Sequence, residues 1–563
     1  MKKYIHLLTI CAAVSLTACD ESRLDIPQKG VIGMDEFYNT DEDAESAAVT
    51  MYADFIQNIG GVDSIYNPFM VAFNLPGDDA LAAGNFYGDN DHIGEIDEFR
   101  YDSQSRVIKN MYQRLYWVAH KCNLITDNFK EGESDIKDRV IAEARTIRAW
   151  LHLMAAIGWY NPPMIDHVLE GTDKPTNYDH NELIKWCAEE AEWAAKSGYM
   201  DVRKDVNDKN GSVKATEGLA WTIAGKAYLF IGNYEKAKEC LKKVIDSGKY
   251  ALVPGERWSE LFHMSGDGNE EKIFEGNVVY NAQVSINGKT TGQHTSLWTW
   301  RCDRFPVIPN NCAVSGWGGL AIDESYAEAM LAHDGDSWRR KGTFMTEEEF
   351  LYTSGIWPSD ATLTTLDAKK MDDQRGIKDP RGMYGQSKYL HHKRMVHPDE
   401  AVKGWSTTSQ TNFLIFRYAE VLLMYAEACA MTSDSDGTGL KALQDIQKRA
   451  GIPEEKIAKT LTLDAVKTEK RFEMWLEGVN WPDLVRWGDF DRLANVGKNI
   501  PTLFDEFFME GKPGYQKEHK LYVEYSNPNE GKTFGFKEGR HEYYPFPYDV
   551  FIINPNLTQK AGF

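Results

Sequence analysis

The chain has 563 residues, of which 63 are Lys or Arg and 85 are Asp or Glu, so its formal net charge is −22. Hydrophobic residues make up 42% of the chain, enough to form packed cores. The acidic excess argues against nucleic acid or an anionic lipid surface as the main partner. A mean hydropathy of −0.49, and the lack of a long apolar run after residue 20, exclude a polytopic membrane protein.

The chain begins with an export signal. Two lysines precede an apolar run that is too short to span a membrane, which is typical of a secretory signal peptide. The run ends in LTAC at residues 16–19, which resembles a bacterial lipobox. We therefore expect residues 1–18 to be removed and Cys19 to be lipidated, so that acyl chains anchor the protein to a membrane. The alternative is ordinary signal-peptidase cleavage beside an incidental cysteine.

The first half of the chain is expected to be mostly helical. Apolar residues recur at helical spacing after an N-cap formed by Thr40 and Asp43, and again over 104–129, 135–160 and 179–197. Between the first two helices, residues 60–102 are rich in Gly, Asn and Asp. This composition predicts a long loop, and long ordered loops are commonly functional.

A helical repeat motif lies at residues 218–248. Its W-x2-A-G-x2-Y and A-x3-L-x2-V spacings are those of a tetratricopeptide helix pair, and they are formed by Trp221, Ala224, Gly225, Tyr228, Ala237, Leu241 and Val244. One repeat cannot bury its own apolar face, so neighbouring pairs must exist. We expect 135–160 with 179–197, and 412–431 with 438–450, to be degenerate partners.

The predicted fold class is mainly α, with tetratricopeptide-like helical pairs supporting a loop-rich insertion that contains short strands. The helical body is expected over about 40–250 and 412–490, with a further helix at 463–478. The insertion covers about 252–411, and a loop-rich tail covers 491–563. Residues 19–563 are thus predicted to form one domain.

Motifs for catalysis or metal binding are weak in this sequence. Neither of the two Gly-Lys-Thr triplets completes a phosphate loop, and Ser315 lacks the flanking glycine of a nucleophile elbow. Of the cysteines, Cys302 and Cys312 could form a disulfide in an exported protein, whereas those in helical segments are expected to be buried thiols: Cys122, Cys187, Cys240 and Cys429. His391, His392 and His397 lie on a basic stretch without metal-ligand spacing. Acidic pairs such as Asp78-Asp79 leave glycoside hydrolysis as a minor alternative.

Two segments combine aromatic rings with polar side chains, as non-covalent carbohydrate sites do, because sugar C–H faces stack on rings and hydroxyls pair with polar groups. In the first segment, an extended chain would place Trp298 and Trp300 on one face. The other candidates in this segment are Tyr280, Asn281, Arg301 and Trp317. The second segment holds Asn85, Phe86, Tyr87 and Asp89. Alternatively, these aromatic residues pack the insertion onto the helices.

Three segments near the end of the chain resemble the SusD/RagB family of outer-membrane nutrient-binding lipoproteins. The first is RYAEVLLMYAEA at 417–428, and the second is EKRFE at 469–473 continuing through WPDLVRWG at 481–488. The third is YPFP at 544–547 with NPNLTQ at 554–559. On physical grounds these motifs are structural: charged residues such as Arg417, Glu420 and Glu427 would form buried ion pairs that fix helix register.

The resemblance implies a non-catalytic protein with no obligatory cofactor, and the sequence assigns no metal-binding residues. It would sit at the cell surface in the outer membrane, bind oligosaccharide or polysaccharide, and pass it to a SusC-like TonB-dependent transporter. The acidic Asp20-Glu21 pair after Cys19 resembles a signal for export to the outer face. The alternatives are a peptide-binding surface lipoprotein or a tetratricopeptide scaffold for another protein.

Overall fold

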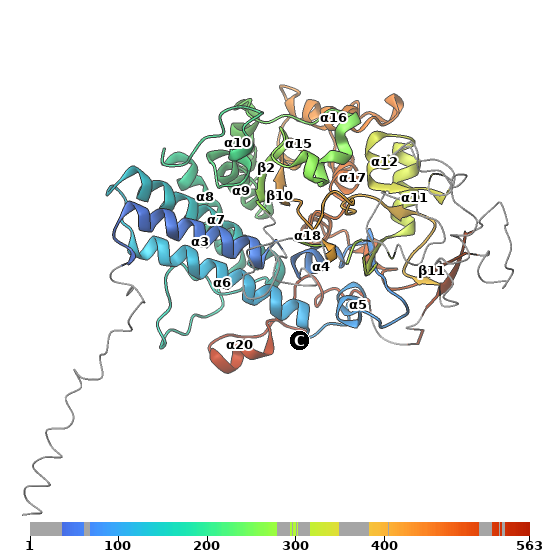
Figure 1. Ribbon diagram of the computed structural model, residues 1–563, viewed down its shortest axis with the longest axis horizontal. Helices are drawn as coiled ribbons and strands as arrows, with labels where there is room; N and C mark the ends of the chain where they lie inside the picture. The colour runs from blue at the N-terminus through green and yellow to red at the C-terminus, as the bar shows by residue number, and fades with distance from the viewer. Residues whose placement is uncertain are drawn as a thin grey trace, which may run out of the picture.

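The computed structural model describes residues 37–60, 68–278, 293–295, 297–299, 301, 316–347, 349, 382–402, 405–505, 521–527, 530–531 and 535–563. It is mainly helical, as predicted, with a body of long helices toward one end and shorter elements toward the other (Figure 1). The helices before the insertion are α3 (Asp41–Asn58), α4 (Pro68–Asn74), α5 (Asp91–Asp97), α6 (Arg106–Asn128), α7 (Asp135–Trp159), α8 (His180–Lys196), α9 (Glu217–Phe230) and α10 (Tyr234–Asp246).

Of the remaining elements, β1 and η2 lie before the predicted insertion and the others lie in or after it. The helices are α11 (Glu324–Asp334), α12 (Trp338–Thr343), α15 (Tyr418–Met431), α16 (Thr438–Ala450), α17 (Leu463–Glu473), α18 (Asn480–Trp487) and α20 (Tyr548–Ile553). Short 3-10 helices are η2 (Lys209–Ser212), η3 (Gly255–Phe262), η4 (Met264–Gly266), η7 (Glu454–Lys456) and η8 (Phe490–Leu493). The strands are β1 (Ala80–Ala82), β2 (Lys272–Gly276), β3 (Gln293–His294), β4 (Leu320–Ile322), β5 (Phe344–Met345), β6 (Met383–Tyr384), β7 (Leu390–His391), β8 (Ala401–Val402), β9 (Trp405–Ser409), β10 (Phe413–Arg417), β11 (Ile500–Asp505) and β12 (Leu521–Ser526).

The helical body is a stack in which each helix packs on its neighbour in the chain. Helix α6 packs on α7, α7 on α8, α8 on α9 and α9 on α10, and the stack continues from α10 through α15 to α16. The close approach of α9 and α10 depends on Gly225, where an added Cβ would lie 2.6 Å from Leu241 Cγ. The predicted tetratricopeptide pair and its two partner pairs are therefore confirmed as packed helices.

Helix boundaries agree with the sequence pattern where caps are strong. Thr40 and Asp43 form a complete capping box at the start of α3, as predicted. Two stretches that the composition assigned to loops contain helices: α4 and α5 lie within 60–102, and α11 and α12 lie within the insertion. The two helices within 60–102 have seven residues each, too short for a periodic pattern to emerge. The segment predicted as one helix at 412–431 begins as strand β10 and becomes helical only at Tyr418.

Strands in the described residues form small antiparallel sheets rather than one large one. Two-stranded sheets pair β1 with β4, β10 with β2, and β5 with β7. Three-stranded sheets have the orders β12-β11-β6 and β3-β9-β8. Since each sheet joins segments far apart in sequence, the strands connect the insertion to the helical body and to the tail.

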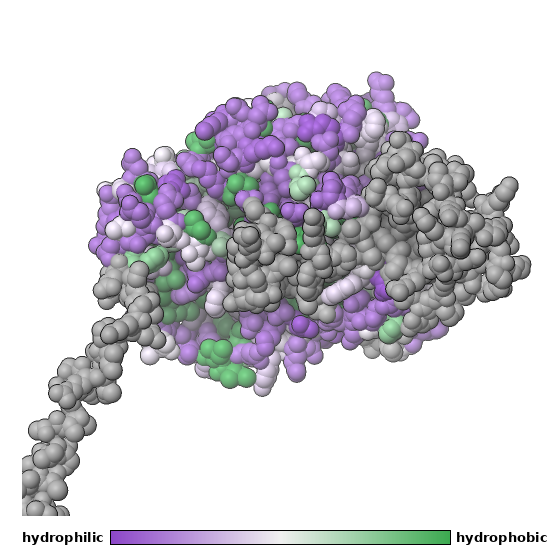
Figure 2. All heavy atoms as spheres, viewed as in Figure 1, coloured by the Kyte–Doolittle hydropathy of each residue, from purple (hydrophilic) through white to green (hydrophobic). Residues whose placement is uncertain are grey.

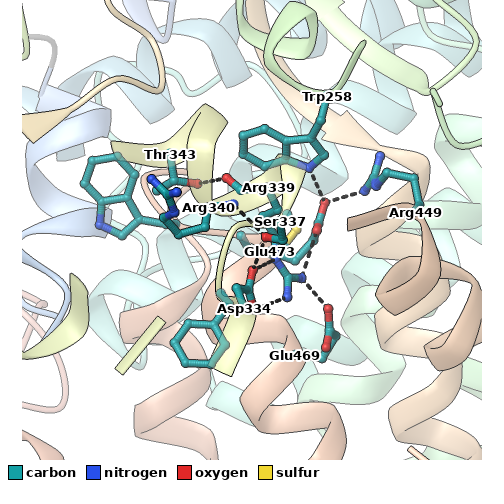
Figure 3. A network of polar contacts seen from close by, with 12 residues as sticks. Trp258, Asp334, Ser337, Arg339, Arg340, Thr343, Arg449, Glu469 and Glu473 are labelled. Carbon is teal, nitrogen blue, oxygen red and sulfur yellow. Dashed lines mark hydrogen bonds and ion pairs between the residues drawn. The ribbon is translucent and has the colours of Figure 1, made fainter. Parts of the chain in front are cut away.

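A buried ion network fastens the insertion to the helices that follow it (Figure 3). Arg339 of α12 is fully buried; its Nε donates to Asp334 Oδ2 at 2.8 Å, and it also pairs with Glu469 and Glu473 of α17. Arg449 of α16 reaches Glu473 Oε1 at 2.5 Å. Removing one partner of such a buried cluster leaves an uncompensated charge, so the network fixes how these helices meet.

Arg417, at the end of β10, extends the same network. Its guanidinium bonds Glu271 of the insertion at 2.8 Å, Glu473 at 2.6 Å and Glu477 at 2.8 Å, and the arginine is fully buried. The family motifs that contain these residues are thus buried ion pairs, as predicted, although Arg417 lies in a strand and not on the helix.

The tail returns to the first helices and closes the core. Tyr544 is fully buried; its N–H donates to Gly158 O at 2.7 Å and its hydroxyl to Ala72 O at 2.6 Å. Trp159 Nε1 donates to Pro545 O at 3.0 Å. The last residues of the chain therefore complete a core begun by α4 and α7. The view in Figure 2 shows a largely hydrophilic surface, with an apolar cluster over α20, where Ile552 and Ile553 are exposed.

Candidate functional site

Three segments that are distant in sequence meet beside the pairing of β1 and β4. The antiparallel register aligns Ala80 with Ile322, and the contact continues where Ala83 N–H donates to Gly319 O at 2.9 Å. Gly84 N–H then donates to Tyr384 O at 3.0 Å. The residues after β1 are thus held between those before β4 and those of β6.

Glycines allow these segments to cross so closely. Gly385 has a φ of +81°, and an added Cβ would lie 2.6 Å from Ala83 Cβ. Gly318 has a φ of +60°, and an added Cβ would lie 3.0 Å from Arg301 Cγ. Because L side chains rarely adopt these conformations, glycine is required at both positions.

A fixed polar pair lies at this crossing. Arg301 Nη1 donates to Asn85 Oδ1 at 2.8 Å, which joins the two segments that the sequence offered as separate carbohydrate candidates. Asp89 Oδ2 accepts from the Asn85 backbone N–H at 2.9 Å and from Asn85 Nδ2 at 2.8 Å. The Asn85 amide is therefore held at both ends, so the arginine and the carboxylate present polar groups in fixed positions.

Two aromatic side chains near this pair are exposed: Phe86 follows Asn85 in the chain, and Trp317 precedes Gly318, which packs against Arg301. Phe86 is 48% exposed and Trp317 is 41% exposed, large fractions for rings of this size. Tyr87 is half-buried; its ring centre lies 6.0 Å from that of Tyr384, and its hydroxyl donates to Glu98 Oε2 at 3.3 Å. Exposed rings beside fixed polar groups are the combination that sugar recognition needs.

The surface here is shallow. Phe86, Tyr87, Arg100 and Tyr384 line a cavity of about 20 Å³, which holds a water molecule but not a sugar ring. Burial lowers the pKa of Arg100, but hydrogen bonds to Asp91 and Glu98 outweigh it and keep the guanidinium charged. A ligand at this place would lie across the rings and would not be enclosed.

The buried carboxyl of Asp97 hydrogen-bonds the backbone at the end of β1. Asp97 is 2% exposed, and its Oδ2 accepts from the Ala82 backbone N–H at 2.9 Å. Burial raises the pKa of Asp97 well above its usual range. Burial, with the nearby carboxyls of Glu98 and Asp97, also raises the pKa of Tyr384. Asp97 and Tyr384 both line the small cavity beside Phe86, and the hydrogen bond from Ala82 to Asp97 stabilises the loop there.

The structure corrects the prediction for Trp298. Its ring is 1% exposed, so it cannot stack on a sugar in this conformation. The prediction assumed an extended chain, but residues 297–299 form a turn. Leu297 O accepts a hydrogen bond from Gly319 N–H at 2.6 Å, and Trp298 O accepts one from His391 Nε2 at 2.5 Å. The other candidates of this segment, Tyr280, Asn281 and Trp300, lie outside the described residues, as do Cys19, Cys302 and Cys312.

The paired carboxylates Asp78 and Asp79 belong to a buried cluster. Asp78 accepts from Arg471 Nη2 at 2.7 Å, Arg492 Nη2 at 2.6 Å and Asn480 Nδ2 at 3.0 Å. Asp79 is 2% exposed, and burial together with the charge of Asp78 raises its pKa to about 7. The ion pairs of Asp78 with two arginines and the burial of Asp79 are those of a structural site, because hydrolysis needs carboxyl groups that reach a glycosidic bond.

The basic stretch at 391–394 is also buried and forms no surface patch. His391, His392 and Lys393 are at most 1% exposed, and Arg394 is 9% exposed. Lys393 Nζ donates to Trp475 O and to Glu477 Oε1, both at 2.6 Å, and burial lowers its pKa to about 7.

The sequence carries no signal that Tyr384 belongs to the candidate site, because a backbone bridge to Gly84 brings Tyr384 there.

Comparisons with known proteins agree with this architecture. A model of the SusD family matches residues 271–563, just over half of the chain. The chain belongs to the SusD family. A SusD-like protein from Bacteroides ovatus is 23% identical over 529 residues, spanning 88% of this chain and 84% of the relative. SusD-like protein P38 from Formosa agariphila is 20% identical over 523 residues, spanning 86% and 92%.

Solved structures of SusD-like proteins have the same fold. Surface glycan-binding protein A from Bacteroides thetaiotaomicron in complex with laminarihexaose aligns with a TM-score of 0.69 at 18% identity, over 93% of this chain and 100% of that one. A laminarin binding SusD-like protein aligns with a TM-score of 0.67 at 20% identity, over 93% and 99%.

Proposed function

We propose that this SusD-family chain is a non-catalytic protein that captures glycans at the cell surface. The observation that carries the proposal is the exposure of Phe86 and Trp317 beside the fixed Asn85–Arg301 pair. The rings offer apolar faces for sugar C–H groups, and the amide, guanidinium and Asp89 carboxylate offer partners for hydroxyls. A shallow surface of this kind suits a long polysaccharide, which extends beyond the site on both sides.

A neutral glycan is the class we propose. The net charge of −22 repels strongly anionic polysaccharides, and the buried stretch at 391–394 offers no basic patch to offset that charge. The solved neighbours are named for binding laminarin and laminarihexaose. Laminarin is therefore the first polysaccharide to test.

Capture at the surface is proposed as the first step of import. The lipobox-like LTAC at 16–19 supports a lipid anchor at Cys19, and none of the helices in the described part of the chain is both long and apolar enough to cross a membrane. A protein held at the outer membrane in this way would pass its ligand to a SusC-like TonB-dependent transporter. Family membership is the support for this partner.

Affinity electrophoresis of residues 20–563 tests glycan capture; this chain contains every residue that the structure describes. Gels would contain laminarin, other neutral polysaccharides or an anionic polysaccharide. We expect retardation by a neutral polysaccharide, and loss of it in a Phe86→Ala/Trp317→Ala double variant. Trp117→Ala is the matched control, because Trp117 is 57% exposed but lies on α6.

The outcomes separate the alternatives. Retardation that survives the double variant would place the glycan elsewhere on the surface. No retardation by any polysaccharide would contradict glycan capture and favour a peptide ligand. Release of reducing sugar from a retarding polysaccharide would show that the protein is an enzyme.

A further inference from the structure

His263, His397 and Glu400 come together although the first is far from the other two in sequence. One side-chain nitrogen or oxygen from each lies within 4.8 Å of the others. His263 lies between η3 and η4, while His397 and Glu400 lie in the turn before β8. His263 and Glu400 are buried, and His397 is half-buried.

The Glu400 carboxylate is held from two sides. Its Oε1 accepts from the Met264 backbone N–H at 2.8 Å, and its Oε2 accepts from the His397 backbone N–H at 3.0 Å. Each oxygen also lies 3.1 Å from His263 Nδ1. The His263 imidazole and the Glu400 carboxylate are therefore held in contact through Nδ1.

We infer that His263, His397 and Glu400 form a binding site for a divalent transition metal, Zn²⁺ above all. Two imidazoles and one carboxylate are ligands that zinc prefers, and three protein ligands leave a fourth position for water. Zinc bonds of about 2.0–2.2 Å bring the ligand atoms of a tetrahedral site to about 3.3–3.6 Å from one another. The 3.1 Å separation of His263 Nδ1 and Glu400 Oε1 is already close to that spacing, so these two ligands need little movement to bind zinc.

His397 supplies the movement that completes the site. Its ring stacks on that of His263 with 3.9 Å between centres and an angle of 15°. Nitrogen lone pairs lie in the ring plane, so two stacked imidazoles do not point at one metal ion. The His397 ring therefore rotates to bind, which a half-buried side chain at the start of a turn can do.

The surroundings suit a metal site. The backbone N–H groups of Met264 and His397 orient the carboxylate, as outer-shell donors do in zinc proteins. Met264 is 40% exposed and lines a cavity of about 410 Å³ with Gln410, so solvent reaches the cluster's edge. This site is distinct from the proposed glycan surface, and no residue is shared between them.

Isothermal titration of residues 20–563 with ZnCl₂ tests the inference, using protein purified without a polyhistidine tag. We expect one zinc ion per chain, and affinity at least about tenfold lower in His397→Ala. His167→Ala is the matched control, because His167 forms an exposed pair with Asp166 at 2.9 Å, away from the cluster. The His167→Ala variant should bind zinc as tightly as the wild type does. Ca²⁺ should not bind, because it prefers sites made only of oxygen ligands.

Cobalt provides a second readout. Co²⁺ in a tetrahedral site of nitrogen and oxygen ligands gives strong visible absorption, which should appear in the wild type and be lost in His397→Ala. Circular dichroism of each variant distinguishes the loss of a zinc-binding side chain from a loss of folding. If His263→Ala does not fold, the zinc affinity of His397→Ala still tests the inference. Absence of zinc uptake at 100 µM by the wild type, or equal uptake by wild type and His397→Ala, would overturn the inference. Because no glycan is present, the result is independent of the proposed function.

Discussion

Arg301 and Asn85, 216 positions apart in the chain, are joined by a 2.8 Å hydrogen bond at the centre of the candidate glycan surface. The bond links the loop after β1 to the segment before β4. It orients the amide that Asp89 also holds. The two residues thus act on a ligand as a unit, and their contributions to binding should not be additive.

A double-mutant cycle tests this coupling. We expect Arg301→Ala and Asn85→Ala each to weaken binding of the retarding glycan, and the double variant to lose less than the sum of the two. Isothermal titration with an oligosaccharide of that glycan gives the three free energies. Additive losses would show that Arg301 and Asn85 contribute to glycan binding independently of each other.

Trp298 and Trp317 should respond in opposite ways to truncation. Trp298 is buried in the core, so Trp298→Ala should lower the free energy of unfolding by about 3–5 kcal/mol. Trp317→Ala should leave stability within about 0.5 kcal/mol and weaken glycan binding by about 1–3 kcal/mol. Urea unfolding and titration of both variants distinguish these roles, and a stable Trp298→Ala with lost affinity would restore that residue to the binding surface.

The contact of Gly225 with Leu241 makes the helix pair sensitive to one methyl group. Gly225→Ala places a Cβ 2.6 Å from Leu241 Cγ, so α9 and α10 must separate. We expect a loss of about 1–3 kcal/mol in the free energy of unfolding. Gly171→Ala is the control, because an added Cβ there has no neighbour within 4 Å, and its melting temperature should hold or rise slightly.

Acid should weaken the buried ion network through Glu477. Burial raises the pKa of Glu477, but the charges of Arg417 and Lys393 outweigh burial and lower it from 4.5 to about 2. A carboxyl with a lowered folded-state pKa stabilises the fold above its unfolded pKa, and this contribution disappears as the pH falls toward about 2.

The measurement compares the wild type with Glu477→Gln by urea unfolding between pH 7 and pH 3. We expect the variant to be less stable by about 3 kcal/mol at pH 7, and the difference to narrow below about pH 4.5. Glu455→Gln, a change at an exposed glutamate of η7, should differ little from the wild type at any pH. A difference that stays constant with pH would mean that the Glu477 charge contributes nothing.

The proposed lipid anchor at Cys19 is tested by cell fractionation. Cys19→Ala should give a folded protein that no longer sediments with membranes, because the acyl chains attach through the Cys19 thiol. Globomycin, which blocks lipoprotein signal cleavage, should make the wild-type protein accumulate with its signal attached. Membrane retention of Cys19→Ala would contradict the lipobox interpretation.

Local patterns predicted the helical body well, because its signals are contained within single helices. The capping box at Thr40 and the small residues of α9 and α10 act over a few positions, and the structure places them as expected. The four cysteines of helical segments are free and buried for the same reason. Short helices such as α4 lack enough turns to show a period.

The candidate site was only partly predictable, because its parts are joined by long-range contacts. Composition identified Phe86, Asn85, Arg301 and Trp317, but not that Arg301 would bond Asn85. Nor could it reveal Tyr384, which arrives through a backbone bridge, or the turn that buries Trp298. The cluster of His263 with His397 shows the same limit, since the two residues approach only through tertiary folding.

The position of Tyr544 bears on how the protein is made. Its hydrogen bonds to Ala72 and Gly158 place the end of the chain inside the core of the first helices. During synthesis the amino-terminal half emerges first, and the end of α7 around Gly158 and Trp159 stays uncovered until Tyr544 and Pro545 arrive. This part of the core thus closes only after residues 544–545 have been synthesised. For the proposed export of this chain the delay is an advantage, because a chain that has not yet closed its core can still be threaded through a narrow translocation channel.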